Sequence, residues 1–323
     1  MNAAAFIAEH AISDADLEQY RDAINPGRNV VSIGEYNVRV LRLLNGREPP
    51  GDPLPFQKTF GRFAFRAGET TLWFGINGHG KSALTGQVAL KLAIDGRKVC
   101  LGSFEMPPER TIQRMVLQAA GNASPSVEFQ GEFFSSLCGS IYIYDKTGRI
   151  DPHLLFAAVR YAADKKGVTH FFVDSLMKCV RGEEDYDGQK DFVHDVMAVG
   201  RETGVHMHLI HHVRKGSDEK GIPSKFDAKG SGAITDQVDN VLCVWRNKAK
   251  EADDAKALEM GAVLTAEGPD FLLICDKQRH GNWEGRWALW GDRNTWHFRE
   301  TKETGWTRGY RLPQTQMEPG AAG

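Results

Sequence analysis

The segment Gly75-Ile76-Asn77-Gly78-His79-Gly80-Lys81-Ser82 decides how the rest of the chain is interpreted. It fits the pattern G-x-x-x-x-G-K-[ST] at every fixed position. The glycines let backbone N–H groups turn toward a phosphate chain, Lys81 supplies a positive charge, and the Ser82 hydroxyl can ligate magnesium. The residues expected to bind the nucleotide here are Gly75, Asn77, Gly78, His79, Gly80, Lys81, Ser82 and Ala83.

The residues on both sides of this loop support a nucleotide site. Thr70 to Phe74 are β-branched, aromatic or aliphatic, as expected of a buried strand. After Ser82, apolar residues recur at helical spacing, so the phosphates would lie at a helix N-terminus, whose dipole favours anions. A glycine-rich turn without a ligand is the alternative.

Length and composition allow one large α/β domain. The chain has 323 residues and a net charge of -2, which argues against a uniformly basic nucleic-acid coat but allows a basic channel. No apolar run approaches the roughly 18 residues that span a bilayer, and the N-terminus lacks the pattern of a signal peptide. The five cysteines are odd in number and widely spaced, which predicts small buried residues in a reducing compartment.

Strands and helices are expected to alternate from Arg62 onward. Strands are predicted at 70–74, 98–102, 140–144, 169–173 and 205–210, and helices at 108–120, 152–166 and 192–199. This order implies an α/β fold with a mainly parallel sheet flanked by helices. Later runs at 241–245, 271–275, 286–290 and 295–298 predict an antiparallel C-terminal extension, with a charged surface helix at 248–260.

Three regions are expected along the chain. Residues 1–53 should form a partly helical arm or linker, with helices near 13–20 and 35–44, although a mobile tail is the alternative. Residues 54–300 should form the nucleotide-binding domain. Residues 301–323 are expected to be a disordered tail because of their composition.

Polar residues follow three of the predicted strands. Asp174 ends an apolar strand, the form expected of a carboxylate that holds magnesium beside a phosphate loop. Glu105 would lie at the same edge of the sheet and could orient or deprotonate the attacking water, unless it is only an acid at a helix start. His211 or His212 could donate to the terminal phosphate, or the nearby histidines could be a mixture of core and surface residues.

Two basic segments suggest partners. Residues 215–232 form a long glycine-rich loop that could grip a nucleic-acid backbone, or could be a solvated charged loop. The residues expected to contact DNA are Lys215, Lys220, Lys225, Lys229 and Gly230. Lys277 and Arg279 stand two residues apart after an apolar strand and could reach a neighbour's nucleotide, or could mark an exposed strand end.

Taken in order, these segments resemble the RecA-like motor domain of hexameric replicative helicases, the DnaB family, especially its phage primase-helicase branch. The matching pieces are 68–72 leading into 75–82, then 103–106, 173–176, 210–215, 229–239, 245–247, and 277–279 with Gly281. They cover about 54–298. That many matches in order are more specific than any one motif.

The resemblance implies roles for individual residues and for the whole chain. It implies ATP and Mg²⁺ as cofactors, with Lys81 and Ser82 on phosphate and magnesium, and Asp174 on magnesium. It implies Glu105 as catalytic base, His212 in preference to His211 as γ-phosphate sensor, and Arg246 as a nucleotide-sensing arginine. Arg279 would be an arginine finger that acts in trans, with Lys277 beside it, and the 215–232 loop would bind DNA in a central channel.

We therefore expect a DNA helicase that hydrolyses ATP and forms a homo-oligomeric ring, usually hexameric in this family. It should move 5′ to 3′ along single-stranded DNA and unwind the duplex of forked DNA. Its expected location is the cytoplasm of a bacterial or phage-infected cell, with no membrane contact and with a primase, polymerase or loader as partner. No primase zinc module is written in the sequence, and the arm does not match the family's usual linker. The alternatives are a RecA-fold filament ATPase in recombination or repair, and a regulatory ATPase that does not bind DNA.

Overall fold

The computed structural model describes residues 32–46, 51–182, 184–212, 222, 232–263, 267–302 and 309–314. The strands are β1 Asp52–Pro53, β2 Ala64–Phe65, β3 Thr70–Phe74, β4 Val99–Ser103, β5 Ile141–Ile143, β6 His170–Asp174, β7 His206–Ile210, β8 Asn240–Arg246, β9 Phe271–Gln278, β10 Gly285–Gly291 and β11 Phe298–Arg299. The helices are α3 Asn37–Leu44, α4 Lys81–Ile94, α5 Pro108–Ala120, α6 Val127–Leu137, α7 Pro152–Tyr161, α8 Tyr186–Thr203, α9 Gly232–Gln237 and α10 Lys248–Glu259.

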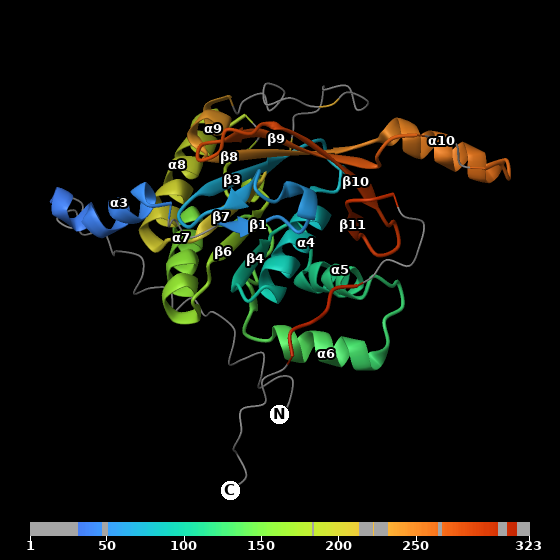
Figure 1. Cartoon of the computed structure of the whole chain (residues 1–323), viewed down its shortest axis with the longest axis horizontal. Helices are drawn as coiled ribbons and strands as arrows, with labels where there is room; N and C mark the ends of the chain where they lie inside the picture. Colours follow the sequence, from blue (N-terminus) through green and yellow to red (C-terminus); the bar gives the residue numbers. More distant parts are fainter. Residues whose placement is uncertain are drawn as a thin grey trace, which may run out of the picture.

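The centre of the fold is a nine-stranded sheet in the order β11-β10-β9-β8-β3-β7-β6-β4-β5 (Figure 1). The six strands from β8 to β5 run parallel, and β9, β10 and β11 add to β8 in antiparallel fashion. The predicted fold class is therefore confirmed, including an antiparallel C-terminal extension. One strand was assigned wrongly, because the run expected at 241–245 forms β8, which pairs with β3 in parallel fashion instead of belonging to the extension. β3 is central and fully buried, as its β-branched and aromatic composition predicts.

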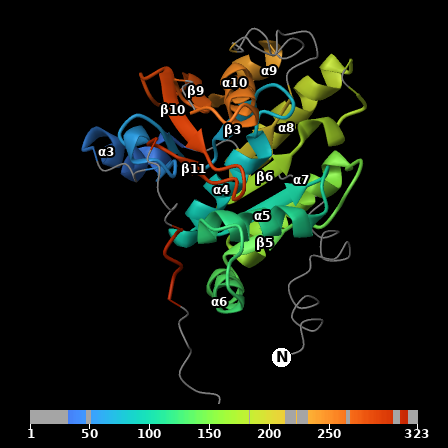
Figure 2. The ribbon, with the colours of Figure 1, turned by 90° about the vertical axis from the view of Figure 1, so that its right-hand side faces the viewer.

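Helices cover both faces of this sheet. One core cluster joins the sheet to α7, α8 and α9, and a second joins the opposite face to α4 and α5. Beyond α5 lies α6, which forms an outer layer on that side (Figures 1 and 2). In the part of the chain that the structure describes, no helix is long and apolar enough to cross a membrane.

Several predicted elements have different bounds in the structure. The sequence did not predict α6 or the small β1–β2 sheet, and α8 begins at Tyr186 instead of Phe192 because the Asp185 side chain caps it by accepting from Gly188 N. The last strand was placed too early, since the carboxylate of Asp292 accepts from Asn294 N and Thr295 N and holds a turn there. The helix predicted near 35–44 is present as a 3₁₀ turn at Ile33–Tyr36 followed by α3, whereas the one near 13–20 lies outside the described residues.

Three buried histidines tie the β1–β2 sheet to the main sheet. Trp73 Nε1 can only donate, so Nδ1 of His208 accepts from it at 3.2 Å, and Nε2 of His208 then donates to Nδ1 of His170 at 3.1 Å. His170 Nε2 in turn donates to Asp52 Oδ2 at 3.0 Å. The third, His206, lies between Thr71 Oγ1 and the Arg66 carbonyl oxygen. These contacts hold the β1–β2 sheet against the main sheet.

Of the five cysteines, four are buried as expected, and Cys138, at the end of α6, is exposed.

Candidate nucleotide site

The loop from Gly75 to Ser82 joins β3 to α4 and requires glycine at two positions. Gly75 has φ of 151°, and a Cβ atom there would lie 2.3 Å from the Val244 carbonyl oxygen of β8. Gly80 has φ of 86° and precedes the first residue of α4, so backbone N–H groups at the helix start face the loop. The loop is therefore wedged between β8 and α4. Asn77 and Gly78 are exposed at its mouth, whereas Ala83 is buried in the first turn of α4.

Lys81 is folded back over this loop. Its side chain is 3% exposed, and Nζ donates to the carbonyl oxygens of Gly75 at 2.8 Å and Ile76 at 2.9 Å. Burial lowers the pKa of Lys81 to about 8, against the opposing effect of the Asp174 carboxylate. At neutral pH the amine therefore keeps its charge. A phosphate chain held by the loop would offer it stronger acceptors than two carbonyl groups.

Ser82 and Asp174 meet at the carboxyl ends of β3 and β6, as predicted. The Ser82 hydroxyl donates to the Asp174 carboxylate. Burial raises the pKa of Asp174 above its usual value, although this hydrogen bond and the charge of Lys81 oppose the rise. A hydroxyl and a carboxylate are hard oxygen ligands, the kind that Mg²⁺ prefers. These two side chains therefore fit a magnesium ion, which would supply positive charge beside a phosphate chain.

Glu105, Ser175 and His212 form a second group at the same edge of the sheet. Ser175 Oγ donates to Glu105 Oε1 at 2.7 Å, and His212 Nε2 lies 3.6 Å from the same oxygen. The contact with His212, with help from Ser175, lowers the pKa of Glu105 to about 2. Glu105 is therefore ionised at neutral pH and can accept a hydrogen bond from water.

The two candidate sensor histidines differ in environment. His211 is buried at the end of β7, and burial, with smaller effects of His212 and Lys81, lowers its pKa to about 4. His212 is partly exposed and faces Glu105. Among the described residues, neither Nδ1 atom has a hydrogen-bond partner. Of the two histidines, His212 is therefore the one that lies beside Glu105.

His79 and Arg246 connect the loop to β8. Arg246 N donates to His79 Nδ1 at 3.1 Å, and burial, with the charge of Lys81 second, lowers the pKa of His79 to about 4. The Arg246 guanidinium donates to Glu251 and more weakly to Gly78 O, and lies 5.8 Å from the Phe271 ring centre. His79 is thus a structural link between the loop and β8, while Arg246 lies at the mouth of the loop.

A cavity of about 540 Å³ adjoins this mouth. Arg246, Phe271, Trp296 and Phe298 are among its lining residues. Phe271 and Phe298 lie within 3.5 Å of where a Gly80 Cβ would be, so the cavity borders the phosphate loop directly. Its lining combines aromatic rings with side chains of both charges, and its size and aromatic rings suit a nucleoside.

Sequence reasoning missed two residues of this site. Ser175 was taken only as part of a motif, although its hydroxyl holds Glu105. Arg114 on α5 lies 5.1 Å from the Trp296 ring centre. Burial lowers the pKa of Arg114, and the nearby Asp174 carboxylate opposes this shift. The helical pattern of α5 showed its apolar face, and nothing in that pattern marked Arg114 as facing the site.

Lys277 and Arg279 lie at the opposite edge of the sheet. Lys277 is near the end of β9, Arg279 follows that strand, and both face α9, so the two basic residues do point to one side. Arg279 lies near Thr70, at the start of β3, because its N–H donates to Asp239 O, whereas the Lys277 backbone is level with Leu72. The phosphate loop follows the other end of β3. Since a strand rises about 3.3 Å per residue, the five residues of β3 put Arg279 on the order of 15 Å from the loop of its own chain.

The residues expected to contact DNA are Lys215, Lys220, Lys225, Lys229 and Gly230. All five lie outside the described residues.

Comparison with known proteins agrees with this architecture. A family model described as an AAA domain matches residues 57–218. One solved structure, described as an ATPase domain, is 18% identical, with a TM-score of 0.69 over 84% of this chain and 100% of that one. A DnaB-like replicative helicase, solved with attention to its interactions with primase, is 18% identical, with a TM-score of 0.64 over 83% of this chain and 67% of that one. The fold is therefore that of the RecA-like motor domain that the ordered motifs predicted.

Proposed function

The chain belongs to the AAA domain family, and from its site we propose that it is an ATP-driven DNA helicase whose active sites are completed by neighbouring subunits. One observation carries the proposal. The phosphate loop, Asp174, Glu105 and His212 gather at one edge of the sheet, while Arg279 and Lys277 stand at the other. The separation of Arg279 from the phosphate loop of its own chain, on the order of 15 Å, supports a role toward the nucleotide of another copy.

In the proposed reaction, Lys81 and the N–H groups of the loop bind the phosphate chain of ATP. Ser82 and Asp174 would hold a magnesium ion, which would supply positive charge beside the phosphate chain. The Glu105 carboxylate accepts a hydrogen bond from the attacking water and orients it. His212 donates to the terminal phosphate and senses its loss, and Arg279 of the next subunit stabilises the charge of the transition state.

A contact between two different edges of the same molecule is a heterologous interface, which closes into a ring or continues as a filament. We favour a ring, hexameric as in the family that the motifs resemble, moving 5′ to 3′ on single-stranded DNA. A primase, polymerase or loader would be its partner. A recombination or repair filament is the second candidate, because the same two edges allow it.

Three measurements test the proposal. We expect single-stranded DNA to stimulate ATP hydrolysis, a forked duplex to be unwound, and Lys81→Ala to lose both activities. Electron micrographs on single-stranded DNA would distinguish closed rings from filaments. Hydrolysis that does not respond to DNA, together with an intact fork, would contradict the helicase and favour a regulatory ATPase.

A further inference from the structure

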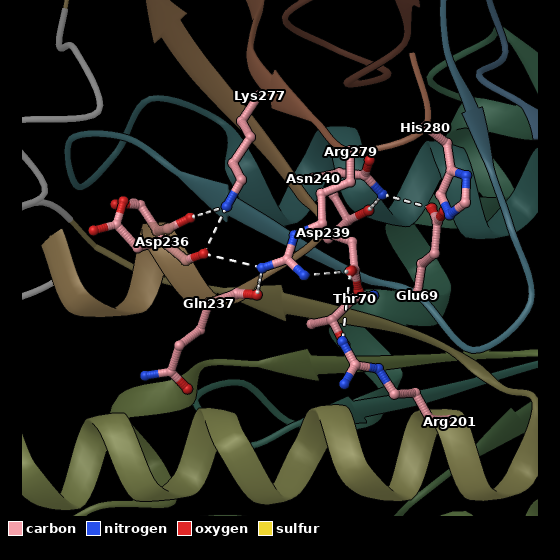
Figure 3. A network of polar contacts seen from close by, with 12 residues as sticks. Glu69, Thr70, Arg201, Asp236, Gln237, Asp239, Asn240, Lys277, Arg279 and His280 are labelled. Carbon is pink, nitrogen blue, oxygen red and sulfur yellow. Dashed lines mark hydrogen bonds and ion pairs between the residues drawn. The ribbon is translucent and has the colours of Figure 1, made fainter.

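A buried carboxylate lies between two arginines at the edge of the sheet that carries Arg279 (Figure 3). Asp239 Oδ1 is 3.7 Å from Arg279 Nη1 and 3.8 Å from Arg201 Nη2. Arg201 extends from α8, and Arg279 from the end of β9. Both arginines also line a cavity of about 240 Å³ with His194, Met197 and Gln237. The sequence motifs gave Asp239 and Arg201 no role.

The backbone fixes the position of Asp239. Its Oδ2 atom accepts from Thr70 N at 2.9 Å, and its own N donates to Thr70 O at 3.1 Å. Arg279 N donates to Asp239 O at 3.0 Å. Asp239 is 6% exposed, so its carboxylate is a rigid negative charge anchored at the first residue of β3.

Carbonyl groups at the end of α9 hold the other side of the basic pair. Arg279 Nη2 donates to Gln237 O at 2.7 Å and Asp236 O at 3.1 Å, and Lys277 Nζ donates to Asp236 O and Thr235 O at 2.8 Å each. The last carbonyl groups of a helix have no partner within it and carry partial negative charge, so they attract cations. Lys277 and Arg279 therefore form the C-terminal cap of this six-residue helix.

We propose that Asp239 is the positioning residue for Arg279. The inference rests on the proposed role of Arg279 toward a neighbour's nucleotide. The carboxylate and the carbonyl groups of α9 restrict the guanidinium to one small region of the edge, which lowers the entropy lost when it contacts a phosphate. The Arg279 side chain is 44% exposed, and such ion pairs are weak, so a phosphate in a dry interface can displace the carboxylate.

Asp239→Asn tests this inference in the full chain assembled on single-stranded DNA. Asparagine keeps the size and the acceptor for Thr70 N but removes the charge. We expect kcat for ATP hydrolysis to fall about two- to fivefold, the range that corresponds to a weak ion pair. KM for ATP should stay unchanged, because the residues that bind ATP lie at the other edge. A change in KM with kcat unaltered would overturn the inference.

Two further variants separate positioning from a general structural effect. Arg201→Gln removes the other arginine, which pairs with Asp239 but is not one of the two side chains that cap α9, and should leave kcat within about twofold of the unmodified chain. In an Arg279→Gln background, with residual turnover followed by radiolabelled ATP, Asp239→Asn should cause no further fall. A further fall there would show that Asp239 acts independently of Arg279 and would overturn the inference.

The same experiments distinguish failure of this inference from failure of the proposed function. Normal kcat in Asp239→Asn beside a strongly impaired Arg279→Gln would overturn only the positioning role. Normal kcat in Arg279→Gln would overturn the action of Arg279 in trans, and with it the role of Asp239.

Discussion

The imidazole of His212 faces the carboxylate of Glu105, with Nε2 3.6 Å from Oε1. Ser175 donates to the same oxygen, so one carboxylate oxygen is held from two sides while the side chain remains partly exposed. The low pKa of Glu105, about 2, follows mainly from the contact with His212. This pair suits a carboxylate that must stay ionised and in one orientation beside a phosphate.

Glu105→Gln should strongly reduce turnover and leave nucleotide binding intact. Glutamine keeps the shape and can still accept from Ser175, but it loses the charge that orients and polarises water. We expect hydrolysis to fall at least about 100-fold, the lower range for a positioned acid or base. A fluorescent ATP analogue should bind with unchanged Kd. Normal turnover would mean that Glu105 does not orient the attacking water.

Arg279→Ala should bind ATP and fail to hydrolyse it, because its own loop is intact but it offers no guanidinium to the next subunit. Complementation tests this more sharply. Mixed with Lys81→Ala, which keeps Arg279, the Arg279→Ala subunits should regain part of their turnover. If two inactive proteins remain inactive after mixing under conditions where unmodified subunits exchange, the action in trans is contradicted.

Gly75→Ala should deform the phosphate loop. The new Cβ would lie 2.3 Å from Val244 O, and φ of 151° is strained for alanine, so the folded state should lose at least about 1–3 kcal/mol. ATP should then no longer raise Tm. The matched control is Gly131→Ala at an exposed position of α6, where a new Cβ would have nothing within 4 Å; the folded state should gain roughly 0.5–1 kcal/mol and keep nucleotide binding. Equal effects of the two variants would contradict this account.

Acid should destabilise the domain through its buried histidines. Burial lowers the pKa of His206 to about 3 and also lowers those of His170 and His208. A depressed folded pKa means that the unfolded state binds protons first, so stability is full above about 6.5 and falls as the pH drops toward about 3. At about 1.4 kcal/mol per pKa unit, the loss through His206 is a few kcal/mol.

His206→Asn checks this prediction. Asparagine keeps a donor for the Arg66 carbonyl oxygen but does not titrate, so chemical denaturation at pH 7.5 and 4.5 should show a smaller acid loss than in the unmodified chain. His194→Asn is the control, since His194 is 77% exposed on α8. This substitution should leave the loss of stability between pH 7.5 and 4.5 unchanged. If His206→Asn loses as much stability between pH 7.5 and 4.5 as the unmodified chain, His206 is not the source of the acid sensitivity.

The sequence was most informative where chemistry constrains both residue type and spacing. The parallel sheet was predicted from the phosphate loop and the apolar strands. Because the carboxyl ends of parallel strands meet at one edge of the sheet, the polar residues that follow these strands were expected to lie together there. The antiparallel strands were found from their turns, with bounds off by a few residues.

Other features depend on contacts between residues far apart in the chain. Nothing local shows that Asp52 accepts from His170, that Ser175 holds Glu105, or that Arg114 faces Asp174. The link between Arg279 and α9 is of the same kind, because 42 residues separate the guanidinium from its main acceptor on Gln237. Such contacts are set by tertiary packing, which periodicity does not record.

β3 joins the phosphate loop at one end to the Thr70–Asp239 contact at the other. In the proposed assembly, a substitution in the loop silences the ATP site of the subunit that carries it, while a substitution at the Asp239 edge weakens the site of the next subunit. One copy altered at both ends would therefore impair two sites of an oligomer. In oligomers of altered and unmodified subunits, the ATP sites that lose activity would then show which end of this strand had been changed.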